Sequence, residues 1–128
     1  MNTGSSWFLI FGAVLFAVFF GLPLFLAPTA WARRIGWKIP EDTDLVNYLG
    51  RSLGGVTLPV IILAFLAAGN PWEYRFLFQL IILMGIFMVI VHGYGFLKRN
   101  QPIIEHLEII LYAVLCLLAF NFYPKPPV

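Results

Sequence analysis

Charged residues are scarce in this sequence, and apolar residues take their place. Asp, Glu, Lys and Arg make up 11% of the 128 residues, against about 25% in soluble globular domains. Hydrophobic residues make up 61%. This balance excludes an ordinary soluble domain and predicts that the lipid bilayer is the solvent and main partner of the chain.

A strong net charge of either sign is missing as well. The formal net charge is only +2, and the Lys and Arg residues stand at the ends of apolar segments instead of forming a basic run. We therefore expect no nucleic-acid partner, and we interpret the basic residues as signals of membrane orientation.

Cysteine is almost absent, since Cys116 is the only one. A single thiol excludes an intramolecular disulfide and a CxxC redox pair. Cys116 lies in an apolar run without an adjacent cation to activate it, so we interpret it as a buried, unreactive side chain. The sequence also contains no motif that names a reaction or a transported species, and we expect no cofactor.

Four long apolar segments fill most of the chain. Residues 7–27 contain no ionisable side chain and, at about 1.5 Å per helical residue, span about 30 Å, the thickness of the hydrocarbon core of a bilayer. The other segments are residues 44–68, 72–97 and 102–122. The sequence therefore predicts an all-α fold in which residues 1–128 form one domain, an integral membrane up-down-up-down four-helix bundle.

Small residues recur at helical spacing in the first two segments. The spacing between successive residues is four in the set Ala13, Ala17 and Gly21, and it is also four between Gly50 and Gly54. Residues at this spacing share one helix face, and small side chains there allow two helix backbones to approach closely in a membrane. We predict that both faces lie at helix–helix contacts.

Basic residues are unevenly distributed among the loops. The first and third loops hold five of them, whereas the opposite side holds two: Arg33, Arg34, Lys38, Lys98 and Arg99, against Arg75 and Lys125. Because loops rich in Lys and Arg stay in the cytoplasm, we predict both odd loops there and both termini outside it. Residues 29–39, which mix tryptophan with cations, are predicted to form a short interfacial helical segment.

The main functional signal is a set of polar side chains at similar depth near the cytoplasmic ends of three helices. A charge in the hydrocarbon core costs about 2.5–3.5 kcal/mol on insertion scales, so such residues usually face the bundle interior and pair. We expect Arg51 to pair with Glu105 or Glu108. The candidate ligand-binding or proton-relay residues are Arg51, His92, Glu105, His106, Glu108 and Tyr112.

Helical spacing predicts how these side chains are oriented. Spacings of three and four place His92 on the same face as Gly85 and Gly95, so His92 is expected to face other helices. The last segment carries three of the candidates on one face and turns a fourth about 100° from Glu105. These are Glu105, Glu108 and Tyr112 on the shared face, and His106 off it.

Three interpretations of this set are open. It is an interhelical network that fixes helix register. Alternatively, it is a binding or proton-relay site in which His92 titrates with a glutamate partner, and acid–base catalysis on a lipid or isoprenoid substrate is one form of this. A metal site from His92, Glu105 and His106 or Glu108 is the third. We assign no metal, because Glu-x-x-Glu with an off-face histidine is weaker than the Glu-x-x-His signature of carboxylate bundles.

The first half of the chain resembles DoxX-like and related uncharacterised bacterial four-helix membrane proteins. A first helix that ends in a proline is followed by Ile35-Gly36, an acidic loop and a second helix that opens with the segment 48–54, YLGRSLG. The resemblance implies a bacterial inner-membrane protein, often an accessory subunit of a redox system. It transfers no catalytic residue.

Two functional hypotheses follow. The preferred one is a small membrane accessory or binding protein that acts by packing against itself or a membrane partner, as a homo-oligomer or in a larger complex. The alternative is a transporter or membrane enzyme that handles a hydrophobic or anionic small molecule at a cytoplasm-side Arg/His/Glu cluster. A cavity that reaches the cluster would favour the alternative, and a closed, fully paired cluster would favour a structural role.

Overall fold

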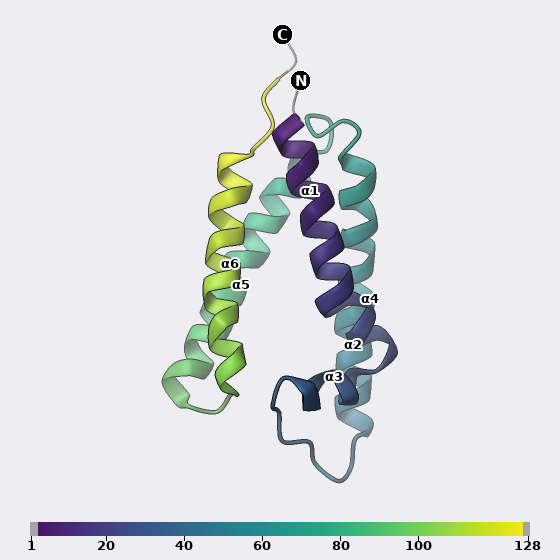
Figure 1. Cartoon of the computed structure of the whole chain (residues 1–128), viewed down its shortest axis with the longest axis vertical. Helices are drawn as coiled ribbons and strands as arrows, with labels where there is room; N and C mark the ends of the chain where they lie inside the picture. Colours follow the sequence, from purple (N-terminus) through teal and green to yellow (C-terminus); the bar gives the residue numbers. More distant parts are fainter. Residues whose placement is uncertain (1–2, 127–128) are drawn as a thin grey trace.

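The computed structural model describes residues 3–126, which form helices and connecting loops without any strand. Helix α1 (Thr3–Phe16) continues through a π-helical turn, η1 (Ala17–Gly21), into α2 (Leu22–Leu26). A short helix, α3 (Pro28–Arg34), comes next, and the long helices α4 (Asp44–Ala67), α5 (Arg75–Lys98) and α6 (Ile103–Asn121) follow (Figure 1). The predicted all-α fold is confirmed.

Four helical stretches are long and apolar enough to cross a membrane: Thr3–Leu26, Asp44–Ala67, Arg75–Lys98 and Ile103–Asn121. They match the four predicted segments, with shifts at the ends. The third begins at Arg75 and not at Trp72, because residues 70–74 form successive turns in which the Glu73 amide donates to the Asn70 carbonyl. Pro71 favours such a turn over a helix start.

The first membrane-length stretch is irregular near Pro23, which follows the π-helical turn η1. Proline has no amide hydrogen, so the carbonyl of Phe19, four residues earlier, loses its helical partner. The Trp31 indole nitrogen donates to this carbonyl at 2.7 Å. A tryptophan of α3 thus satisfies a backbone group that the proline leaves free, and α3 is held against the end of the first stretch.

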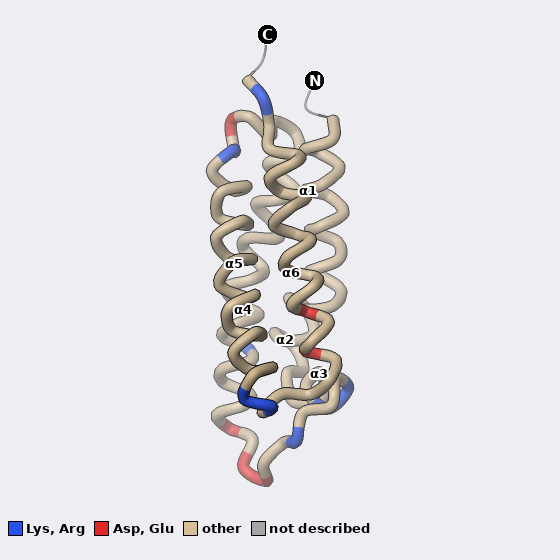
Figure 2. The backbone as a smooth tube through the Cα atoms, turned by 90° about the vertical axis from the view of Figure 1, so that its left-hand side faces the viewer, with Lys and Arg blue, Asp and Glu red and all other residues tan. Residues whose placement is uncertain are grey.

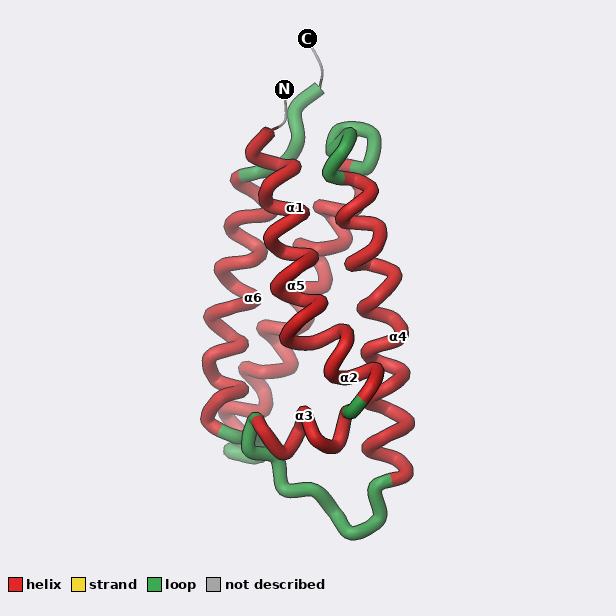
Figure 3. Tube along the Cα trace, turned by 45° about the vertical axis from the view of Figure 1, so that its right-hand side comes forward, coloured by secondary structure: helices red, strands yellow, loops and turns green. Residues whose placement is uncertain are grey.

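Helix α3 runs crosswise to the long helices at one end of the molecule (Figure 3). The predicted interfacial segment, residues 29–39, is therefore helical only in its first part. The helix ends before Gly36, which has a φ of +94° that glycine adopts without strain. On its other side α3 is fixed to α4, because the Thr29 hydroxyl donates to the Asn47 side-chain oxygen at 2.7 Å.

The long helices pack in two groups. Helices α1 and α2 pack with η1 against α4, and α5 packs against α6. The groups share a core at the end that holds the chain termini, where Phe8 stacks on Phe78 with ring centroids 5.6 Å apart and the Ser5 hydroxyl donates to the Phe122 carbonyl at 2.7 Å. From this end they diverge toward the end that holds α3 (Figure 1).

Basic residues are concentrated at the α3 end of the molecule (Figure 2). Arg33 and Arg34 occupy the last turn of α3, and Lys98 occupies the last turn of α5. Acidic residues at this end are found in the loop before α4 and at the start of α4, and two more lie within the apolar part of α6. These two, Glu105 and Glu108, are the ones that require a structural explanation.

The predicted small-residue faces lie at helix contacts, as expected. A Cβ atom on Gly54 would lie 2.5 Å from the Phe25 backbone nitrogen, and one on Gly21 would lie 2.8 Å from the Ile61 Cδ1 atom. A Cβ atom on Gly50 would collide with Pro28. Glycine therefore sets the distance between α4 and the end of the first stretch.

Gly54→Ala is expected to lower the thermal unfolding midpoint in detergent, because the added methyl group would displace the Phe25 backbone at a cost of about 1–3 kcal/mol. Gly55→Ala is the matched control, since its Cβ would meet the Phe25 ring at 3.9 Å, an ordinary contact. Alanine also favours a helix over glycine by about 1 kcal/mol. Equal midpoints for the two variants would contradict the contact.

Candidate functional site

His92 lies on the face of α5 that packs against α6, and only 7% of it is exposed. A glycine brings the helices together on this face: a Cβ atom on Gly85 would collide with the Cys116 sulfur and lie 3.4 Å from the Tyr112 carbonyl oxygen. At the turn between the helices, the Gln101 amide donates to the His92 carbonyl at 3.0 Å. The prediction that His92 faces another helix is confirmed.

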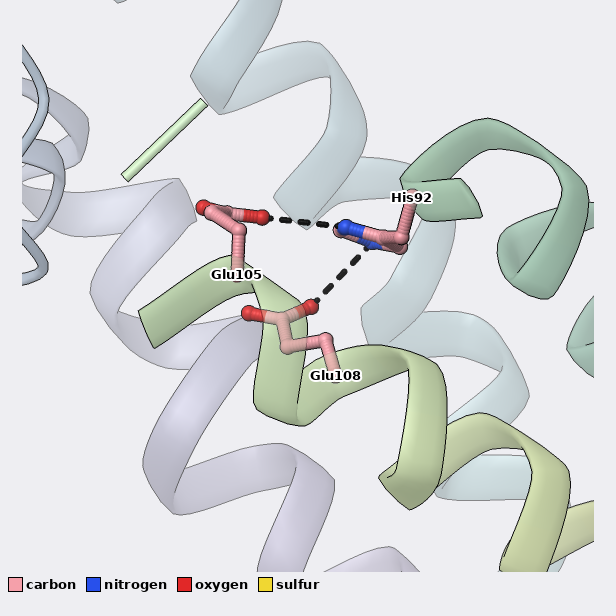
Figure 4. Close-up of side chains that lie close together, drawn as sticks. All are labelled: His92, Glu105 and Glu108. Carbon is pink, nitrogen blue, oxygen red and sulfur yellow. Dashed lines mark ion pairs between the residues drawn. The ribbon is translucent and has the colours of Figure 1, made fainter. Parts of the chain in front are cut away.

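Two glutamates of α6 point at the His92 imidazole (Figure 4). Its Nδ1 atom lies 3.1 Å from the Glu105 Oε2 atom, and its Nε2 atom lies 3.3 Å from the Glu108 Oε2 atom. Glu105 is 4% exposed. The spacing of three puts both carboxyl groups on one helix face. We call His92, Glu105 and Glu108 the His–Glu–Glu cluster.

Tyr112 extends the cluster by one helical turn along α6. Its ring stacks on the His92 imidazole, with centroids 5.5 Å apart and planes 18° from parallel. Its hydroxyl forms a hydrogen bond with Glu108. Tyr112 therefore fixes the imidazole and one carboxylate together, as the shared face with Glu105 and Glu108 predicts.

Trp37 is a member of the site that sequence reasoning missed. Its indole nitrogen donates to the Glu105 Oε1 atom at 2.7 Å, from the loop that follows α3. The sequence marks Trp37 only as one of several interfacial tryptophans, because nothing in the pattern shows that Gly36 turns the chain next to Pro102 at the start of α6. This hydrogen bond connects the cluster to the loop at the α3 end of the molecule.

The expected pairing of Arg51 with Glu105 or Glu108 is wrong. Arg51 is exposed, lies in a surface hollow with Asp44 and Tyr48, and forms no ion pair with either glutamate in the described part of the chain. Its helix, α4, belongs to the group that diverges from α5 and α6 at this end. An arginine at this depth can instead extend its long side chain toward the headgroups.

His106 also lies outside the cluster, against Phe96 of α5. Its ring meets the Phe96 ring edge-on, with centroids 4.8 Å apart. Its Nε2 atom is buried without a hydrogen-bond partner. The predicted rotation of about 100° from Glu105 explains why His106 cannot join the carboxylates.

The charges in the cluster do not balance. It contains two carboxylates and one imidazole, and its further hydrogen-bond partners, Trp37 and Tyr112, are neutral. Even with a protonated imidazole, two ionised carboxylates leave one negative charge in a buried site. Since an uncompensated buried charge costs several kcal/mol, the cluster needs an additional proton or a cation.

An apolar cavity of about 140 Å³ lies between the two helix groups and reaches Tyr112. Thr57 and Tyr112 are the only lining side chains with hydroxyl groups, and the others are apolar. The Thr57 hydroxyl is used within α4, where it donates to the Leu53 carbonyl at 2.8 Å. Tyr112 therefore links the cavity to the His–Glu–Glu cluster.

Comparisons of the chain with protein-family models, with curated proteins and with solved structures found no match. The resemblance to DoxX-like proteins therefore stays a prediction. The cluster and the cavity are the features of the molecule that point to a function.

His92→Leu is expected to lower the free energy of unfolding by about 3 kcal/mol in detergent, because it leaves two buried carboxylates without the imidazole between them. His106→Leu is the matched control and should cost little, since it removes a buried nitrogen that has no partner. Arg51→Leu should leave the unfolding midpoint unchanged. A loss as large for His106→Leu as for His92→Leu would contradict the assigned geometry.

Proposed function

We propose that this chain is a multi-pass membrane protein, an up-down-up-down four-helix bundle in the bacterial inner membrane. Large apolar side chains point outward on each membrane-length stretch, among them Phe11, Val56, Phe87 and Leu117, which are each at least 65% exposed. Soluble monomers rarely expose such extensive apolar surface. The bacterial inner membrane follows from the DoxX-like resemblance.

The proposed orientation has the α3 end in the cytoplasm. The concentration of Lys and Arg at that end supports it, because short loops rich in these residues are retained on the cytoplasmic side (Figure 2). The His–Glu–Glu cluster would then lie near the cytoplasmic face. The chain termini would lie outside the cytoplasm.

This orientation is tested by labelling introduced cysteines in a Cys116→Ala background. Asn2→Cys and Val128→Cys, two positions outside the described residues, should react with a membrane-impermeant maleimide added to intact cells. Asn100→Cys, in the turn between α5 and α6, should react only after the membrane is opened. Labelling of the Asn100 position alone in intact cells would reverse the orientation.

For the activity, we propose that the bundle binds a small hydrophobic molecule that carries a hydrogen-bonding group. The observation that supports this most is the continuity between the apolar cavity and Tyr112, whose hydroxyl belongs to the cluster. A cavity of about 150 Å³ with apolar walls binds a molecule the size of benzene. The occupant would therefore place one ring, or a short alkyl segment, between the helix groups.

The polar end of the cavity favours a hydrogen-bond donor on the ligand. Beyond Tyr112 lie the two carboxylates, which accept hydrogen bonds, and Arg51 is not available to neutralise an anion. A hydroxyl or a protonated amine suits these acceptors better than an acid does. The part of the sequence-based alternative that named an anionic ligand therefore loses its support.

The accessory role predicted from the sequence, packing against a second copy or another membrane protein, stays a prediction. A cluster whose carboxylates are already engaged by His92 and Trp37 also fits a structural role at the α5–α6 contact. The cavity is the feature that such a role does not require. The test of ligand binding therefore targets the cavity.

The test compares two probes of similar size, 4-ethylphenol and ethylbenzene, by titration calorimetry on the protein in lipid nanodiscs. The wild type should bind 4-ethylphenol about 2- to 13-fold more tightly, because one net hydrogen bond contributes about 0.5–1.5 kcal/mol. Tyr112→Phe should remove this preference while keeping the affinity for ethylbenzene.

A cavity-filling variant provides the control for partition into lipid. Gly12 lines the cavity, and a Cβ atom there meets nothing within 4 Å, so Gly12→Phe should fill the space and abolish binding of both probes. Gly93→Phe also extends into open space but away from the cavity, and it should bind like the wild type. Equal heats for the wild type and Gly12→Phe would refute the proposed activity.

A further inference from the structure

We propose that the His–Glu–Glu cluster binds one divalent transition-metal ion of the Zn²⁺ class. The three side chains each carry an atom that could bind a metal ion or orient one of its ligands, and these atoms lie within 4.8 Å of one another. Imidazole and carboxylate are a ligand set that first-row divalent metals accept. This inference is independent of the proposed hydrophobic ligand.

The unused nitrogen of His92 identifies the ligand atom. His92 is more than nine-tenths buried, and its Nε2 atom has no hydrogen-bond partner among the described residues, although it points at Glu108. The distance of 3.3 Å from Nε2 to the Glu108 Oε2 atom is close to the separation of about 3.4 Å that tetrahedral geometry gives for two ligands about 2.1 Å from the ion. His92 Nε2 and Glu108 would thus be the direct ligands.

Glu105 has the position of an orienting group. Its Oε2 atom lies 3.1 Å from His92 Nδ1, on the side of the ring opposite to Nε2. Histidines that bind metals commonly donate the other ring N–H to a carboxylate, which fixes the tautomer and leaves the metal-facing nitrogen unprotonated. Trp37 holds the second oxygen of Glu105 in place.

A divalent ion also removes the charge imbalance. Two ionised carboxylates and a neutral imidazole carry a charge of −2, which a divalent cation cancels. A proton added to the imidazole would cancel only half of this charge. Since the site is buried and contains no Lys or Arg, neutralisation by a divalent ion removes the largest cost of placing both glutamates there. Two protein ligands leave coordination positions for water or a polar group near Tyr112.

The test is titration of chelator-treated, tag-free protein in detergent with Zn²⁺ alone, and with Co²⁺ as a spectroscopic probe. We expect one ion per chain. Bound Co²⁺ should give an absorption band typical of nitrogen and oxygen ligands, and added Zn²⁺ should abolish this band by displacing Co²⁺. Glu108→Gln should weaken Zn²⁺ binding at least 100-fold, whereas Glu105→Gln should weaken it about 10- to 100-fold. Two control variants should bind Zn²⁺ like the wild type: His106→Gln, and Glu41→Gln, which changes an exposed carboxylate.

Binding to the wild type is the decisive arm, because it needs no variant to fold. Absence of stoichiometric Zn²⁺ binding, or the same affinity in Glu108→Gln and Glu41→Gln, would overturn the metal site and favour an added proton as the neutralising charge. The 4-ethylphenol titrations are made on metal-free protein. Failure of the metal site therefore leaves the proposed ligand-binding activity to be judged separately.

Discussion

Burial of two carboxylates beside one imidazole is the constraint on which the rest of this structure depends. Glu105 and Glu108 lie inside an apolar helix, and His92 is the basic side chain that contacts both of them. Water would solvate these groups far better than hydrocarbon does, so they are tolerated only when the imidazole lies close to the carboxylates and hydrogen bonds satisfy their remaining atoms. Each neighbouring feature of the fold contributes to this closeness or to the hydrogen bonding.

The α5–α6 contact provides the closeness. Gly85 lets the two helices approach, and Tyr112 stacks on the imidazole while its hydroxyl holds Glu108. A further hydrogen bond comes from the first half of the chain: α3 is fixed to the first stretch through Trp31, and the loop after α3 brings the Trp37 indole nitrogen to Glu105. Proline at position 23 thus contributes indirectly, because it frees the carbonyl that Trp31 occupies.

Much of this arrangement could be predicted from the sequence, for physical reasons. Apolar segments of bilayer length can satisfy their backbone only as helices, so the four stretches and the all-α class follow from composition. Helical spacing was enough to place His92 toward a neighbouring helix and to group Glu105 with Glu108 and Tyr112, whereas His106, which it turned away from Glu105, had still counted as a candidate. Both arguments use distances along one helix, which the sequence contains.

Contacts between distant helices could not be predicted in the same way. Arg51 has the right depth to pair with Glu108, but depth does not determine which way a helix faces, and α4 diverges from the pair α5 and α6 at that level. The same lack of lateral information hid Trp37, which reaches Glu105 from 68 positions away in the chain. The apolar cavity was also hidden, since it lies between groups whose separation no spacing encodes.

The most direct test of this account is a solid-state NMR measurement on the wild-type protein in lipid bilayers, with ¹⁵N in histidine rings and ¹³C in glutamate side-chain carboxyl groups. The account predicts dipolar coupling from both ring nitrogens of His92 to glutamate carboxyl carbons, and none from His106, because the first imidazole lies between two carboxylates and the second contacts Phe96. A His92 ring without coupling to any glutamate would contradict the central claim.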